Sequence, residues 1–187
     1  MTPMLGIMAS SISGSKANTN SYESIATFNG TGSSSTITFS SIPSTYKHLQ
    51  IRMVVQSTYT GASTSYMYPI RCNGDSGNNY SMHTIRANGS SVTASGSGSR
   101  DNMFAGDYPT TNVSNTVGAI IIDILDYQNT NKYKTFRTLE GYDANGSGQV
   151  NFTSGSWQST SAITSITLPD AYLNWSTASK FALYGIK

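Results

Sequence analysis

The stretch at residues 42–56 constrains the fold of this chain more than any other. Its apolar residues Leu49, Ile51, Met53 and Val55 alternate with the polar residues His48, Gln50 and Arg52. A two-residue period is typical of a strand with one buried face. Pro43 precedes this run, at a position where its missing N–H costs no ladder hydrogen bond. We therefore expect a central strand here.

Short strand-like runs separated by turn residues recur through the rest of the chain. The expected runs are residues 22–28, 35–40, 66–71, 80–86, 117–125, 133–142, 149–157, 163–168 and 181–187. No run of ten or more residues has helical spacing, and 187 residues suffice for one well-buried domain. The pattern predicts an all-β, jelly-roll-like antiparallel β-sandwich over residues 21–187.

Local signals refine this expectation. Residues 117–125 are apolar on both faces, which predicts a strand buried between two layers. Pro69 favours an edge position for its strand. The Ser- and Gly-rich residues 87–101 are expected to form an exposed loop, and the Asn-Gly pair at 145–146 a hairpin turn. The apolar alternation at residues 181–187 predicts a strand paired inside a sheet.

Residues 1–20 are expected to form an extended N-terminal arm. Its apolar tip contains Met4, Leu5, Ile7 and Met8, and a polar tether without periodicity follows at residues 10–20. Two interpretations stay open. Either the tip docks into a neighbouring subunit or a host structure, or the segment is a terminal strand that folds back on its own domain.

Composition excludes several classes of partner. Charged residues make up 11% of the chain, against a usual share of roughly 25%, so Ser, Thr, Asn and Gly must form much of the surface. The 11 Lys and Arg are scattered, which argues against nucleic acid. No segment has the length or flanks of a secretory signal or membrane span, so we expect synthesis in the cytoplasm and no membrane partner. The single Cys72 excludes an internal disulfide.

Motifs that suggest chemistry fail in their context. Residues 74–77, Gly-Asp-Ser-Gly, match a serine protease signature, but His48 is the only upstream histidine and a β-turn is the better interpretation. Residues 143–148 resemble the start of an EF-hand, yet its twelfth position is Ser154. A weak surface calcium site at Asp143, or at Asp126 with Asp123, is a minor alternative. We expect no catalytic residue, no metal ligand and no cofactor, hence no enzyme.

Aromatic residues near turns are the candidate surface contacts. The set is Tyr108, Trp157, Tyr172 and Trp175, of which the last two lie in the loop after Pro169. Aromatics flanked by Asn and Asp are suited to stacking on sugar rings or anchoring a protein contact. The alternative is that they complete the core at the rim of the sandwich.

Residues 42–52, 129–135 and 181–187 resemble a family of small tailed-bacteriophage virion proteins. Residues 4–10 and the string Ser-Tyr-Glu-Ser-Ile-Ala-Thr at 21–27 are also similar to that family. The resemblance spans nearly the whole chain and carries over no catalytic or binding residue. It implies a jelly-roll-like module on the outside of a virion.

Three functions are compatible with these observations. The first is a capsid decoration or cement protein, a homotrimer anchored on the major capsid protein by its arm. The second is a tail fibre or baseplate component that binds a host surface glycan through its loops. The third is a free carbohydrate-binding lectin. The arm favours the first, because about 20 residues before the domain cannot form a fibre shaft.

Overall fold

The computed structural model describes residues 21–61, 65–170 and 173–187, so the arm lies outside the described residues. The described part contains twelve strands and no helix. The strands are β1 (Tyr22–Asn29), β2 (Thr36–Phe39), β3 (His48–Val55), β4 (Ser65–Cys72), β5 (Tyr80–Ala87), β6 (Val92–Arg100), β7 (Met103–Pro109), β8 (Gly118–Leu125), β9 (Lys134–Asp143), β10 (Gly148–Trp157), β11 (Ile166–Pro169) and β12 (Lys180–Ile186). Within these ranges, no helix could span a membrane.

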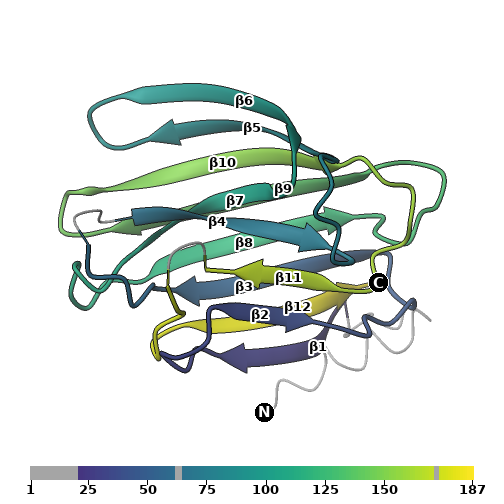
Figure 1. The fold of residues 1–187 in the computed structure, drawn as a ribbon, viewed down its shortest axis with the longest axis horizontal. Coiled ribbons are helices and arrows are strands. Elements are labelled where there is room, and N and C mark those ends of the chain that lie inside the picture. The colour runs from purple at the N-terminus through teal and green to yellow at the C-terminus, as the bar shows by residue number, and fades with distance from the viewer. Residues whose placement is uncertain (1–20, 62–64, 171–172) are drawn as a thin grey trace, which may run out of the picture.

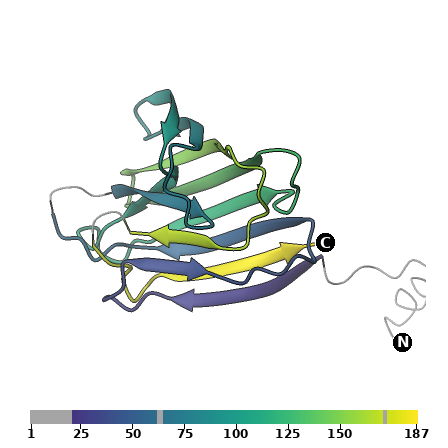
Figure 2. The same cartoon turned by 45° about the vertical axis from the view of Figure 1, so that its right-hand side comes forward.

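The strands form two stacked antiparallel sheets. The larger has eight strands in the order β1-β12-β3-β8-β9-β10-β5-β6, and the smaller has four in the order β2-β11-β4-β7 (Figure 1). The smaller sheet lies over one face of the larger, and the β5–β6 hairpin continues past it at the top of the view (Figures 1 and 2). The predicted all-β sandwich is confirmed, whereas this strand order does not confirm a jelly-roll connectivity.

Strand β3 occupies the interior position expected of it, between β12 and β8. The side chains of Leu49, Ile51, Met53 and Val55 are buried against the smaller sheet. Strand β12 pairs with β1 on one side and β3 on the other, which confirms that residues 181–187 lie inside a sheet. The β9–β10 hairpin is confirmed too, with Asn145 at φ 59° and Gly146 at φ 92°.

Residues 87–101 are not the loop that their composition predicts. Strand β6 covers Val92–Arg100 and pairs with β5 along its length. The pairing uses backbone groups, so side chains as small as Ser and Gly do not prevent it. Strand β6 is the edge of the larger sheet and is mostly exposed, which is why its sequence lacks the apolar alternation of a buried strand.

Pro69 does not mark an edge strand. Strand β4 lies between β11 and β7, inside the smaller sheet. The register of β4 on β7 shifts between Tyr68 and Pro69. Such an irregularity tolerates a residue without an N–H, so the proline is compatible with an interior position.

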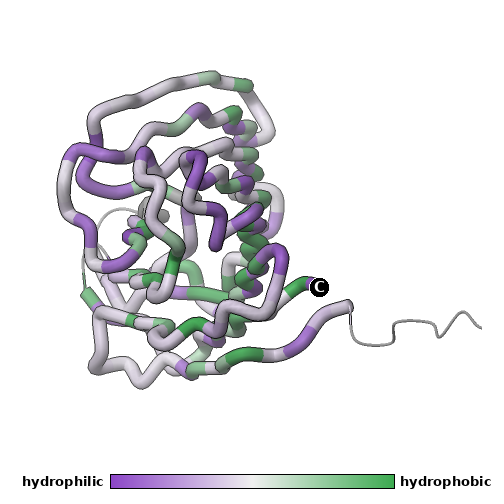
Figure 3. The backbone as a smooth tube through the Cα atoms, turned by 90° about the vertical axis from the view of Figure 1, so that its right-hand side faces the viewer, coloured by the Kyte–Doolittle hydropathy of each residue, from purple (hydrophilic) through white to green (hydrophobic). Residues whose placement is uncertain are grey.

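Strand β8 is buried on one face only, contrary to the expectation of two covering layers. Ile120, Ile122 and Ile124 point into the core, whereas Ile121 and Leu125 are exposed on the outer face of the larger sheet. Figure 3 shows this sheet edge-on, as a stack of strands along one side of the molecule. No described residue forms a second layer on that outer face.

The two faces of β9 provide a direct stability test. Phe136 is fully buried and Leu139 is 53% exposed. We expect Phe136→Ala to lower the free energy of unfolding by about 3–5 kcal/mol, because it leaves a cavity in the core. Leu139→Ala should change it by less than about 0.5 kcal/mol. Urea unfolding at low protein concentration measures both, and equal losses would contradict the assigned faces.

Candidate functional site

The larger sheet changes polarity between β8 and β9. On the inner face, the residue row that includes Ile122 continues through Thr138, Thr153 and Thr84 to Ser95. On the outer face, the adjacent row runs through Ile121, Leu139, Phe152, Ile85 and Ala94. In these two rows the inward side chain is apolar at β8, whereas the apolar side chains of β9, β10 and β5 point outward. Farther along β9 and β10, Phe136 and Trp157 still point into the core.

The outer row and the parallel row beside it, which contains Ala119, Val150 and Val92, form one surface, here called the outer apolar face. It consists of Ile85, Val92, Ala94, Ala119, Ile121, Leu139, Val150 and Phe152. Exposure is 40% for Ile121, 53% for Leu139, 48% for Phe152 and 54% for Ile85. Monomeric proteins rarely leave such contiguous apolar surface in water, and it commonly marks a site of protein contact.

A shallow groove of about 390 Å³ extends the outer apolar face towards β1. Its lining is mainly apolar and includes Ile121, Val54 and Ala182. Arg52 and Lys180 also line it, so two cationic side chains flank the apolar surface. This groove widens the area that a protein partner could cover.

The inner face beyond β8 contains a cavity of about 230 Å³, here called the inner polar cavity. It lies between β5, β6 and β10 on one side and β7 on the other. Its lining residues are Met82, Thr84, Arg86, Thr93, Ser95, Phe104, Gly106, Asp107, Asn151 and Thr153.

An ion pair forms one wall of the inner polar cavity. The Arg86 guanidinium donates a hydrogen bond to Asp107 Oδ2, and Asn151 Nδ2 donates to the same oxygen at 2.8 Å. The Asp107 side chain is only 4% exposed. Burial raises the pKa of this carboxyl above its ordinary value, while the charge of Arg86 and the bond from Asn151 oppose the shift.

Glu140 lies behind this pair and is almost completely buried. Its Oε2 accepts a hydrogen bond from the backbone N–H of Asp107 at 2.6 Å. Burial, followed by the charge of Asp107, raises the pKa of Glu140 to about 9, so this carboxyl is protonated near neutral pH. Gly106 makes the approach feasible, because a Cβ there would lie 2.4 Å from the Glu140 carboxyl carbon.

The site offers hydrogen bonding and compensated charge rather than metal ligands. Within the described residues, no three His, Cys, Asp or Glu are placed to hold a metal ion. The Asp143 carboxylate, a candidate calcium ligand in the sequence, accepts a hydrogen bond from Gly146 N–H within its turn at 3.0 Å. Asp126 pairs with Lys132 and lies 3.4 Å from His48.

Three of the four predicted surface aromatics are core residues. Trp175 and Tyr108 are fully buried, with ring centroids 5.0 Å apart, and Trp157 is 2% exposed. The prediction that they contact a ligand at the surface is wrong, and the alternative that they complete the core holds. Each polar atom is satisfied inside: Trp175 Nε1 donates to Leu168 O, Tyr108 OH to Asp170 and Trp157 Nε1 to Asp75.

The remaining predicted contacts lie outside the described residues. These are Tyr172 in its loop and the arm residues Met4, Leu5, Ile7 and Met8.

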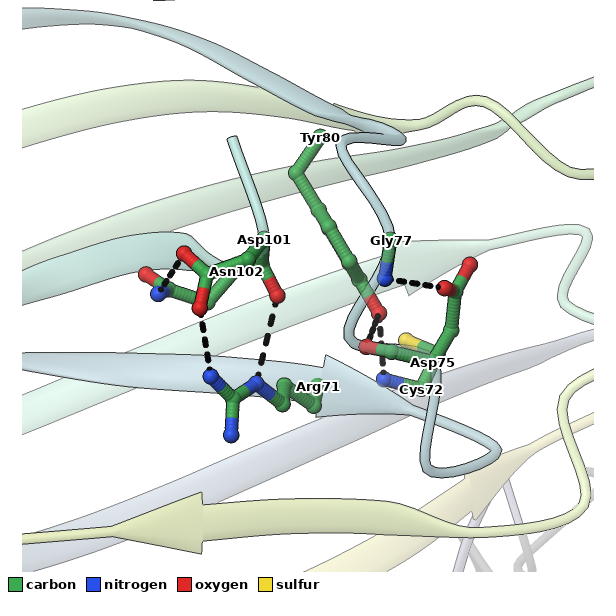
Figure 4. Close-up of polar contacts among 7 residues, drawn as sticks. All are labelled: Arg71, Cys72, Asp75, Gly77, Tyr80, Asp101 and Asn102. Atoms are coloured by element: carbon green, nitrogen blue, oxygen red, sulfur yellow. Dashed lines mark hydrogen bonds and ion pairs between the residues drawn. The ribbon is translucent and has the colours of Figure 1, made fainter. Parts of the chain in front are cut away.

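The Gly-Asp-Ser-Gly string at residues 74–77 forms a turn between β4 and β5, as predicted. Asp75 Oδ1 accepts the Gly77 N–H at 2.8 Å, and Asp75 N–H donates to Cys72 O at 2.9 Å. The Tyr80 hydroxyl ties the turn to β4, since it accepts from Cys72 N–H and donates to Asp75 O (Figure 4). His48 instead accepts a hydrogen bond from Asp126 N–H at 3.0 Å.

Beside this turn, Arg71 forms an ion pair with Asp101 at 2.6 Å, and Asn102 donates to the same carboxylate (Figure 4). Together these contacts anchor the β4–β5 and β6–β7 connections. The turn therefore has a structural role.

Sequence reasoning missed both surfaces. Asp107, Glu140 and Arg86 are separated in sequence and share no motif. One signal was present: in β10, Val150 and Phe152 alternate with Asn151 and Thr153, which shows two chemically distinct faces. The alternation does not say which face is inward.

A scan of protein-family models finds no match to this chain, and searches of curated proteins and of solved structures find none either. The resemblance to phage virion proteins therefore stays a prediction.

The buried Glu140 predicts a particular pH dependence of stability. Above its ordinary pKa of 4.5 the unfolded chain releases this proton, while the folded chain retains it up to about pH 9. The unfolded state then binds fewer protons, so the free energy of unfolding falls as pH rises, by at most about 1.4 kcal/mol per pH unit. Glu140→Gln removes this titration and should be the more stable protein at about pH 8, an advantage lost near about pH 4.

Thermal unfolding across this pH range is the measurement, with Glu23→Gln as control. The hydrogen bond from Lys187 lowers the pKa of Glu23, so its stabilising effect is lost as pH falls and its removal leaves the alkaline slope intact. Identical alkaline slopes in wild type and Glu140→Gln would contradict the assignment.

Proposed function

We propose that this protein is a non-enzymatic structural protein on the exterior of a bacteriophage particle, a capsid decoration or cement protein. The observation that carries the proposal is the outer apolar face. The resemblance of residues 42–52 and 181–187 to virion proteins supports the same assignment.

The dimensions and chemistry of the outer apolar face favour a protein partner. The row from Ile121 on β8 to Ala94 on β6 crosses five strands, or about 19 Å at a spacing of about 4.8 Å. Burial of its exposed Leu, Phe and Ile side chains would contribute roughly 25 cal/mol per Å². A low-charge, hydroxyl-rich chain is suited to a lattice in which its neighbours are other proteins.

The N-terminal arm supplies a second attachment in this proposal. The tether at residues 10–20 spans at most about 40 Å when fully extended. That length allows the tip with Leu5 and Ile7 to reach an adjacent subunit of the major capsid protein, beyond the footprint of the domain. We propose a homotrimer at a lattice three-fold position, located in the virion after synthesis in the host cytoplasm.

A tail fibre or baseplate component that binds a host glycan is the second candidate. The aromatics first assigned to that contact are buried in three cases, Tyr108, Trp157 and Trp175. The inner polar cavity, and not these aromatics, is the observation that favours this second candidate.

Charge placed on the outer apolar face should prevent attachment. We expect the double variant Leu139→Lys with Phe152→Lys to fold normally, because both side chains are about half exposed. Its binding to particles of the encoding phage that lack the protein should fall at least about tenfold, equivalent to about 1.4 kcal/mol. Co-sedimentation measures binding, and thermal unfolding checks the fold.

Thr38→Lys is the matched control, because Thr38 is an exposed residue of the smaller sheet. Binding of the double variant at the wild-type level would exclude the outer apolar face as the docking surface. Failure of the wild-type protein to bind particles would overturn the assignment to the virion exterior.

The arm is tested by deleting residues 1–10. This deletion removes none of the twelve strands, which begin at Tyr22, so the thermal unfolding midpoint should stay unchanged. Particle binding should be lost if the tip docks in trans. Normal incorporation of the truncated protein into particles would contradict a role of the arm in attachment.

A further inference from the structure

We propose that the inner polar cavity binds one neutral sugar unit of a glycan, through the hydroxyl groups of β5 and β10 and the Arg86–Asp107 pair. This inference is the same whether the protein belongs to the phage head or to the tail. It does not depend on the outer apolar face, which lies on the opposite side of the sheet.

The space suits a single ring. At about 230 Å³ the cavity is smaller than the roughly 300–1,000 Å³ typical of drug-sized ligands. Phe104 and Gly106 of β7 close it on one side. Thr93 and Ser95 line it from β6 and are themselves exposed, so the cavity opens beside this edge strand, where the rest of a glycan could continue into solvent.

The hydrogen-bonding groups match a polyhydroxylated ligand. Thr84 Oγ1 and Thr153 Oγ1 lie 3.0 Å apart, and each hydroxyl can both donate and accept. Asn151 is 2% exposed, and its Oδ1 has no hydrogen-bond partner among the residues that the structure describes. That oxygen has almost no accessible surface, so we assign the hydrogen bonds to the sugar to the Thr84 and Thr153 hydroxyls and to Arg86.

The charges of the cavity favour a neutral ligand. Asp107 compensates the charge of Arg86, and its Oδ2 already accepts from Arg86 and Asn151. An anionic or cationic sugar would therefore meet no uncompensated counter-charge. The Arg86 guanidinium retains further N–H donors for hydroxyl oxygens, and its side chain is 38% exposed.

The cavity also presents apolar surface. Met82 and Phe104 contribute to its lining beside the hydroxyl groups. A sugar ring has polar edges and an apolar C–H face, and an aromatic side chain packs against such a face. The combination distinguishes a sugar from a small inorganic ion, which would gain nothing from Met82 or Phe104.

Binding is tested with the full chain and the methyl glycosides of glucose, galactose, mannose and N-acetylglucosamine. Saturation-transfer NMR detects binding, and titration gives the dissociation constant. We expect at least one of these neutral glycosides to bind with a constant on the order of 1 mM or tighter. Glucuronate and glucosamine serve as charged comparisons and should bind more weakly.

Two variants locate the binding. Thr153→Val removes one hydroxyl at nearly constant shape and should weaken binding about tenfold. Ser95→Trp places a large side chain at the exposed opening and should abolish binding without disturbing the core. Ser154→Ala is the matched control, since Ser154 neighbours Thr153 but is exposed on the outer face.

Three outcomes would overturn the inference: no binding of any neutral glycoside, binding unchanged in both Thr153→Val and Ser95→Trp, or tighter binding of a charged sugar. The co-sedimentation of the protein with particles is measured separately. Loss of sugar binding and loss of attachment can therefore be told apart.

Discussion

The antiparallel ladder between β8 and β9 is the constraint on which the rest of the structure depends. It pairs Ile122 with Thr138 and Ile121 with Leu139. Because side chains alternate strictly along a strand, this register directs every second residue of β9 to the core side. Strands β10, β5 and β6 come next in the spatial order of the same sheet. Each ladder in turn directs polar residues inward, from β9 as far as the edge strand β6.

The charged groups placed inside by this register require compensation, and the sandwich provides it locally. Strand β7 approaches closely because Gly106 has no side chain, which brings the Asp107 N–H to Glu140 and the Asp107 carboxylate to Arg86. Protonation of Glu140 avoids a second buried negative charge next to Asp107. The inner polar cavity lies beside these contacts, between β7 and the hydroxyl groups of β5 and β10.

The two faces of this half of the sheet consequently suit different partners. The outer face offers Leu139, Phe152 and Ile85 to a protein surface that can exclude water. The inner face offers hydroxyl groups and a compensated ion pair to a small polar ligand. One register thus explains both surfaces.

Strand β8 is apolar on both faces, because its inner face packs in the core and its outer face belongs to the outer apolar face. The layer that would cover this outer face is a neighbouring protein in the particle that we propose.

The sequence alone determined the elements that depend on local chemistry. The alternation at residues 48–55 predicted an interior strand, the Asn145-Gly146 pair predicted a hairpin through its positive φ angles, and the apolar end predicted a paired final strand. These signals are local, because a two-residue period and turn geometry involve neighbouring residues only. The strand β6 escaped prediction because an edge strand needs backbone partners and not apolar side chains.

Only the tertiary structure decided which face of each strand is inward and which distant residues meet. In β10, apolarity alone would direct Val150 and Phe152 to the core, yet pairing with β9 directs Asn151 and Thr153 there. Likewise Arg86, Asp107 and Glu140 come from three strands and meet because the smaller sheet packs on the larger. A two-residue period fixes that a strand has two different faces, whereas the direction of each face is set by hydrogen-bond register with strands far away in the chain.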